Sequence, residues 1–177
     1  MLIGLPVVDA ILEHHAPCIA TDLPGYRNHV YRLINLVDAM APLDRDDQLV
    51  VAIAAAFHDI GIWTANTWDY IQPSLDAAEH WLDGAALSGT ASLVASMIEN
   101  HHKLRACPSG TDPLVELFRR ADWCDVTLGH LRSGVTRVQY GKLLALFPSA
   151  GFHRRLLVLA ARHARRWPFR PFPMLRF

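Results

Sequence analysis

Residues 50–61 read VVAIAAAFHDIG, an apolar run that ends in an imidazole beside a carboxylate. No polar residue interrupts residues 49–57, so a helix here would be apolar on every face and would lie in the middle of the fold. An ionised carboxylate buried at its end is costly unless it is paired or bound to a metal ion. The sequence therefore predicts that another part of the chain supplies a partner for Asp59.

The composition is that of a globular protein with one domain. The chain has 177 residues, of which 51% are hydrophobic and 19% are charged. No stretch approaches the roughly 20 apolar residues that cross a bilayer, and residues 1–20 lack the cationic start and apolar centre of a signal peptide. We therefore expect a cytoplasmic protein without a membrane partner. Cys18, Cys107 and Cys124 form no C-x-x-C pair, which argues against a disulfide framework and a cysteine zinc site.

The net charge is zero, yet the two halves of the chain carry opposite charges. Residues 1–100 hold 3 Lys and Arg against 13 Asp and Glu, which gives −10, and residues 101–177 hold 14 against 4, which gives +10. A basic half attracts nucleic acid or a phosphorylated small molecule, or else it docks onto the acidic half. We favour compensation within the molecule, and because no base-reading motif is present, nucleic acid is the less favoured partner. The sequence leaves homo-oligomerisation open.

The rest of the chain predicts helices separated by short breakers, without strand alternation. Beside the central helix, which follows the acidic residues 44–47, helices are expected at 6–16, 26–40, 74–82, about 90–103, 112–128, 136–147 and 152–167. Ser74 is the expected N-cap of its helix after an aromatic loop at 61–73, and Leu128 is expected on the buried stripe of the helix at 112–128. The predicted fold is an all-α, compact single-domain helical bundle over residues 1–177, with a Pro-rich tail at 168–177.

Four polar side chains fall on otherwise apolar helical faces, namely His29, His58, Asp59 and Asp122. Two imidazoles and two carboxylates make a compact nitrogen and oxygen site that suits one divalent transition metal, such as Mn, Fe, Co, Ni or Zn. A single histidine on an apolar face is more often a hydrogen-bonded core residue than a ligand. The prediction of a metal site therefore depends on the four residues together.

The order of these residues resembles the H…HD…D signature of the HD-domain superfamily of metal-dependent phosphohydrolases. It runs from His29 through His58-Asp59, in the context AAFHDIG, to Asp122 in the context RADW, and covers about residues 26–129. The resemblance implies a helical fold of the HD-domain type, with a metal held by these four side chains. It also implies hydrolysis of a phosphate ester of a small phosphorylated compound, with a nucleotide as one candidate and a metal-bound water as the nucleophile.

A second metal is not expected from this resemblance. Family members with two metals carry a histidine at the start of the next helix, and the matching position here is Ser74. Such sites also carry a histidine pair at the end of a helix, and this chain has it at the end of residues 98–102, which read IENHH. His101, the first of the pair, is therefore a candidate for a catalytic or substrate-facing residue. Its alternative is an ordinary histidine that interacts with a helix dipole. Two alternative functions stay open, an iron-dependent oxygenase of the superfamily, which the missing histidine disfavours, and a non-catalytic binding or regulatory module.

Cations near the metal would stabilise the charge that develops on a transferred phosphoryl group. Lys103 and Arg105 follow the histidine pair and Arg119 precedes Asp122 by about one turn, so these three are the predicted substrate-binding cations. The alternative for each is a solvated surface charge. Tyr70 is the predicted aromatic contact to the substrate, with a hydrophobic cover as its alternative. The predicted catalytic residues are Asp59, His101 and Lys103.

One further carboxylate belongs to the same helical face as a predicted ligand. Asp125 follows Asp122 by three residues, so the two side chains project from neighbouring positions of one helix. We expect Asp125 to orient a ligand or a water molecule, or else to pair with a neighbouring arginine.

Overall fold

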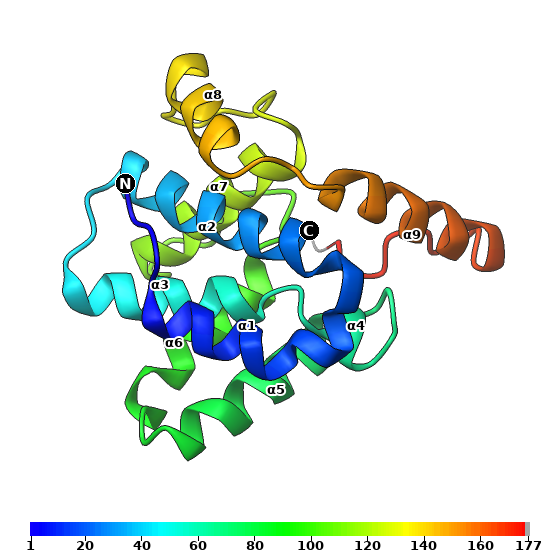
Figure 1. Cartoon of the computed structure of the whole chain (residues 1–177), viewed down its shortest axis with the longest axis horizontal. Coiled ribbons are helices and arrows are strands. Elements are labelled where there is room, and N and C mark those ends of the chain that lie inside the picture. The colour runs from blue at the N-terminus through cyan, green and yellow to red at the C-terminus, as the bar shows by residue number, and fades with distance from the viewer. Residues whose placement is uncertain (176–177) are drawn as a thin grey trace.

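The apolar stretch forms helix α3 (Arg45–Phe57) at the centre of the molecule, and residues 50–57 are all buried. Asp44 caps this helix, because its side chain accepts hydrogen bonds from the backbone N–H groups of Asp46 and Asp47 at 3.0 and 2.9 Å. In the computed structural model, which describes residues 1–175, other helices enclose α3 (Figure 1). The helices in contact with it are α1 (Pro6–Ile19), α2 (Leu23–Met40), α5 (Ile71–Gly84), α6 (Ala91–Asn100) and α7 (Pro113–Val126).

The remaining regular elements are also helical, and residues 1–175 contain no β-strand. They are α4 (Gly61–Thr64), α8 (Arg137–Leu146), α9 (Phe152–Arg166) and two short 3-10 helices at Ala20–Asp22 and Ser88–Thr90. The prediction of an all-α helical bundle is therefore confirmed. Cys18, Cys107 and Cys124 are free. None of the helices in the described part of the chain is both long and apolar enough to span a bilayer.

Helices α8 and α9 lie at the periphery, and both contact α2 (Figure 1). The Pro-rich segment that follows α9 returns to the body of the protein, where Met174 is buried against Ile62, Tyr70 and Ile71. Residues 176 and 177 of the predicted tail lie outside the described residues. The described part of this segment is therefore packed.

Several predicted boundaries were wrong. Helix α1 continues to Ile19 through Pro17, and the predicted loop at 61–73 contains α4 and the first turn of α5. Ser74 is not an N-cap, because it lies inside α5, where its buried hydroxyl accepts a hydrogen bond from the backbone N–H of Gly61 at 3.0 Å. Leu128 lies beyond the end of α7, has a φ of 53° and is 49% exposed, so it does not extend the buried stripe of that helix.

Gly61, the first residue of α4, allows the start of this helix to approach α5 closely. A β-carbon at this position would lie 2.5 Å from the carbonyl oxygen of Tyr70 and 2.9 Å from Cβ of Pro73. Since real β-carbons do not approach a backbone oxygen so closely, a larger residue would push α5 away. The glycine that follows His58 and Asp59 therefore has a packing role, and it brings Tyr70 near these two residues.

Candidate metal centre

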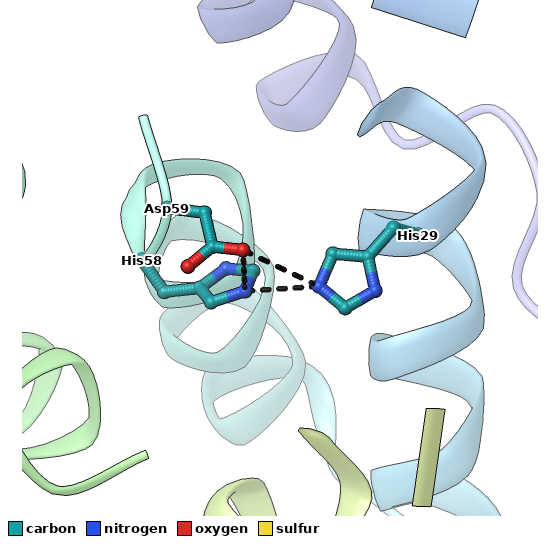
Figure 2. A group of neighbouring side chains, drawn as sticks. All are labelled: His29, His58 and Asp59. Atoms are coloured by element: carbon teal, nitrogen blue, oxygen red, sulfur yellow. Dashed lines mark hydrogen bonds and ion pairs between the residues drawn. The ribbon is translucent and has the colours of Figure 1, made fainter. Parts of the chain in front are cut away.

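Two histidine rings meet in the interior of the protein, one from α2 and one from the residue that follows α3 (Figure 2). The Nε2 atoms of His29 and His58 are 3.0 Å apart. The opposite ring nitrogens are occupied, since Nδ1 of His58 donates to the Ala55 carbonyl at 2.8 Å and Nδ1 of His29 donates to Asp125 Oδ2 at 2.7 Å. With both Nδ1 atoms as donors, the neutral rings direct two Nε2 lone pairs at each other. Such a pair repels unless a proton or a metal ion lies between the nitrogens.

Two carboxylates complete this group. Asp59 Oδ2 lies 3.4 Å from Nε2 of His58 and 3.9 Å from Nε2 of His29. Asp122 Oδ1, from α7, lies 3.6 Å from Nε2 of His29 and 3.8 Å from Nε2 of His58. All four side chains are buried. The structure thus brings together the four predicted ligands, and we call this candidate site for a metal ion the metal centre.

The other oxygens of the two carboxylates face a second pair of histidines. Nε2 of His101 lies 3.5 Å from Asp59 Oδ1, and Nδ1 of His102 lies 3.4 Å from Asp122 Oδ2. None of these four atoms has a hydrogen-bond partner, although all four are buried. Candidate ligand atoms of Asp59, His101 and His102 also lie within 4.8 Å of one another. We call these three residues the second group, and His102 is a member that the sequence analysis did not select.

Electrostatics at the metal centre favour a bound cation. Burial lowers the pKa of His29 to about 4, so this ring is neutral near pH 7 and its Nε2 lone pair can accept a proton from His58 or bind a metal ion. Burial alone would lower the pKa of His58, but the charges of Asp59 and Asp122 raise it to about 9. Burial, together with the charges of Asp59 and Asp125, raises the pKa of Asp122 well above its usual range. The raised pKa values mean that His58 and Asp122 retain protons in the absence of a metal ion. A metal ion would replace these protons, so the donor set fits such an ion.

A buried ion pair between Arg32 and Asp125 holds one of the candidate ligands, His29, in place. Arg32 donates to Asp125 from Nε at 2.6 Å and from Nη2 at 2.8 Å, and the hydroxyl of Tyr140 donates to the same carboxylate at 3.1 Å. Although burial opposes it, hydrogen bonds from His29 and Arg32 hold the pKa of Asp125 well below its usual range. Asp125 is therefore ionised and fixes the orientation of the His29 ring.

Both expectations for Asp125 are met, since it orients His29 and pairs with an arginine, but the sequence did not identify Arg32 and Tyr140 as its partners. A signal for Arg32 was present, because this cation lies three residues after His29, on the helix face that the apolar periodicity assigns to the core. Tyr140 carried no comparable signal. It belongs to α8, which the sequence predicts as a helix without indicating the neighbour against which it packs.

A cavity of about 470 Å³ lies next to the metal centre, three of whose residues line it. This volume is within the range of roughly 300–1,000 Å³ that is typical of small-molecule sites. His29, Asp59, His102 and Asp122 form its polar floor. The other lining residues are mainly apolar or aromatic: Trp68, Tyr70, Trp123, Val126, Thr127, Leu128, His153, Leu156, Leu157, Ala160, Phe172, Met174 and Leu175.

The predicted substrate residues are only partly brought to this cavity. Tyr70 lines it, and its hydroxyl shares a hydrogen bond of 2.6 Å with Nε2 of His102. Lys103, Arg105 and Arg119 do not line it. The guanidinium of Arg119 pairs with Glu116 at 2.6 Å and also donates to the Lys103 carbonyl at 3.0 Å. The chain after His102 is thus held against α7.

The chain has no significant match among protein-family models, curated proteins or solved structures. The resemblance to the HD-domain superfamily therefore depends on the residues of this chain alone. The case for any activity depends in addition on the geometry of the metal centre and its cavity.

Proposed function

We propose that this chain is a metal-dependent phosphohydrolase that cleaves a phosphate ester of a small compound. The supporting observation is the convergence of His29, His58, Asp59 and Asp122, with distances of 3.0–3.9 Å between the facing nitrogen and oxygen atoms. Three of the four, His29, Asp59 and Asp122, line an open cavity. In this proposal the four side chains hold one divalent transition metal ion. Such an ion lowers the pKa of a coordinated water from ~15.7 towards ~7 and polarises a phosphoryl oxygen.

The protein's own residues then have distinct tasks. Asp125 and the Ala55 carbonyl hold the rings of His29 and His58, so that the two Nε2 atoms face each other between the two carboxylates. Tyr70, which lines the cavity, shares a hydrogen bond with His102 of the floor, and in this proposal the two residues supply a proton to the departing alcohol oxygen. The apolar walls exclude water and so strengthen the electrostatic interactions at the floor.

Metal analysis combined with a screen of phosphate esters tests this proposal. We expect purified protein to retain about one equivalent of a divalent transition metal, by analogy with mononuclear sites of this donor type. Asp59→Asn should lose both the metal and the activity, because it removes a charged oxygen ligand at nearly constant volume. Asp76→Asn, at an exposed position of α5, is the matched control and should retain both. Undiminished activity in metal-free protein would contradict the proposal.

The second group favours a different candidate, an iron-dependent oxygenase with two metal ions. The unpartnered atoms of Asp59, His101 and His102 are the observation in its favour, because a second ion would bind them. Two equivalents of iron per chain, with one lost in His101→Ala, and a coupled di-iron signal after anaerobic loading would support this candidate. A single equivalent without a coupled signal would remove it.

A non-catalytic binding module is the remaining alternative. The complete set of four ligand-type side chains argues against it, because a module without catalysis has little need for all four. Tight binding of a phosphate compound without turnover across the whole panel of esters would support it. Turnover that depends on Asp59 would exclude it.

A further inference from the structure

The polar and the apolar residues that line the cavity lie in different parts of it. Among residues 1–175, the carboxylates that line it are those of Asp59 and Asp122, and both lie at its floor with the rings of His29 and His102. The walls that rise from this floor present hydrocarbon or aromatic surface from four separate segments, and they include Trp68, Trp123, Leu156 and Met174. A ligand that reaches the metal centre with one end therefore lies against apolar surface along the rest of its length.

The walls offer few free hydrogen-bonding groups. The indole N–H of Trp123 is already used, since it donates to the Lys103 carbonyl at 3.1 Å, and the hydroxyl of Thr127 donates to the Trp123 carbonyl at 2.6 Å. The indole nitrogen of Trp68 is the wall donor that is buried without a partner in the described residues. No lysine or arginine among residues 1–175 lines the cavity.

A ligand with many hydroxyl groups would bind such walls at a cost. Each buried polar group that finds no hydrogen-bond partner costs about 1–3 kcal/mol. A sugar or a nucleoside would bury several of these groups against the leucine and aromatic side chains of the walls. The same walls suit a hydrocarbon group, because burial of apolar surface is itself favourable.

Large apolar side chains are also exposed around the cavity. Leu157 is 72% exposed, Leu128 is 49% exposed and Phe172 is 47% exposed, and all three line the cavity from different segments of the chain. A ligand in the cavity would remove part of this surface from water. Exposed apolar surface that is continuous with a candidate site is typical of a ligand-binding region.

We propose that the substrate of this centre is a phosphate ester of an apolar alcohol, whose alkyl chain or aromatic ring lies against Trp123, Leu156 and Leu157. This inference rests on the proposed phosphohydrolase function and adds the chemical class of the substrate. In the reaction, the oxygen of water forms a bond to phosphorus and the bond between phosphorus and the alcohol oxygen breaks. The alcohol leaves with a proton, and inorganic phosphate is the second product.

Binding of a homologous series of n-alkylphosphonates tests the apolar subsite without turnover. Methyl- to hexylphosphonate share one head group and are not hydrolysed, so their affinities for the metal-loaded full chain, measured by calorimetry, report the contribution of the alkyl chain. Each methylene that is buried in the cavity should tighten binding about two- to fourfold. An affinity that does not change with chain length would overturn the proposal.

Two leucine variants test whether the alkyl chain binds in this cavity. Leu157→Gln should retain the fold, because this side chain is 72% exposed, and it should reduce the ratio of hexyl- to methylphosphonate affinity several-fold. Leu131→Gln is the matched control, since Leu131 is 54% exposed and does not line the cavity, and it should leave the ratio unchanged. Equal ratios in the two variants would show that the alkyl chain does not bind in this cavity.

Turnover of the corresponding alkyl phosphates tests the apolar subsite and the phosphohydrolase function separately. Alkyl phosphates of increasing chain length, a hexose phosphate and a nucleoside monophosphate are compared by kcat/KM, and we expect the value to rise with alkyl chain length. Turnover that is independent of chain length would overturn the apolar subsite while the phosphohydrolase function stands. Chain-length-dependent binding of the phosphonates without turnover of any ester would overturn the phosphohydrolase function while the apolar subsite stands.

Discussion

The buried guanidinium of Arg32 fixes one side of the metal centre. It pairs with Asp125 through two nitrogen atoms and also donates to the Phe147 carbonyl at 2.7 Å. Asp125 in turn accepts the hydrogen bond that orients His29. Both charges are fully buried, so the loss of either one leaves the other without compensation.

Arg32→Leu should therefore destabilise the fold strongly. Removal of one partner of a buried ion pair typically costs about 3–5 kcal/mol in the free energy of unfolding. Arg27→Leu is the control on the same helix, because Arg27 pairs with Asp9 at 2.9 Å near the surface, where such a pair contributes at most about 1 kcal/mol. Urea unfolding of both variants measures the difference. Equal losses would show that the buried pair does not stabilise the protein as proposed.

The junction between α3, α4 and α5 depends on a close approach of backbone segments. Gly61 begins α4, its N–H donates to the Ser74 hydroxyl, and the Tyr70 carbonyl oxygen lies 2.5 Å from where a β-carbon of residue 61 would be. The junction also positions Tyr70 at the edge of the cavity, where its hydroxyl meets His102. A shift of α5 would therefore change both the stability of the protein and the shape of the cavity.

Gly61→Ala should lower the free energy of unfolding by about 1–3 kcal/mol, the usual cost of forcing an extra carbon into a packed site. Gly84→Ala provides a comparison within α5, since a β-carbon there meets nothing within 4 Å. This second change should be neutral or stabilising by up to ~1 kcal/mol, because alanine favours helix more than glycine does. Thermal or urea unfolding measures both values. Similar effects at the two positions would contradict the packing role of Gly61.

Glu116 connects α7 to the segment that follows the histidine pair. Its carboxylate pairs with Arg119 and accepts a hydrogen bond from the Cys107 N–H at 3.0 Å. The hydrogen bond from Arg119 lowers the pKa of Glu116 from its usual 4.5 to about 2. Because the pKa is lower in the folded state, the ionised form stabilises the fold above about pH 4.5, and this contribution is lost as the pH falls towards 2.

The difference in stability between the wild type and Glu116→Gln should follow the same dependence on pH. We expect the wild type to be more stable at pH 6, with a difference that shrinks between pH 4.5 and pH 2. Urea unfolding over this range measures it, with Glu13→Gln at an exposed position of α1 as the control. A difference that stays constant over the range would show that the pairing of Glu116 does not depend on its charge.

Two ion pairs join the basic C-terminal part of the chain to the acidic half. Arg155 in α9 lies 2.9 Å from Asp22, and Arg170 lies 3.3 Å from Asp69. At these two positions the opposite charges of the halves compensate within the molecule, as favoured from the sequence. The other arginines of α9 are exposed to solvent, namely Arg154, Arg162, Arg165 and Arg166.

The metal centre lies between α2, α3 and α7, so ion binding should stabilise the molecule as a whole. An ion at 100 times its Kd adds about 2.7 kcal/mol to the stability of the native state, which for a chain of this size raises Tm by about 5–10 °C. Scanning calorimetry of metal-loaded and chelator-treated protein measures the shift. Asp59→Asn should show no comparable shift on addition of the metal. An identical shift in the variant would place metal binding elsewhere.

The sequence by itself determined the helical class and the buried position of residues 50–57, because helical periodicity, capping residues and long apolar runs are local properties. It also singled out His29, His58, Asp59 and Asp122, since polar groups on apolar faces need partners. Boundaries such as the first turn of α5 were missed, because contacts with Gly61 rather than a local capping signal determine them.

The tertiary structure alone decided which groups share the site. His102 reaches Asp122 because the segment after α6 is held against α7 by hydrogen bonds to the Lys103 carbonyl. The apolar cavity likewise forms where α7, α9 and the segment after α9 meet above the metal centre. Residues distant in sequence come together there through packing, and packing depends on the whole set of contacts rather than on any local pattern.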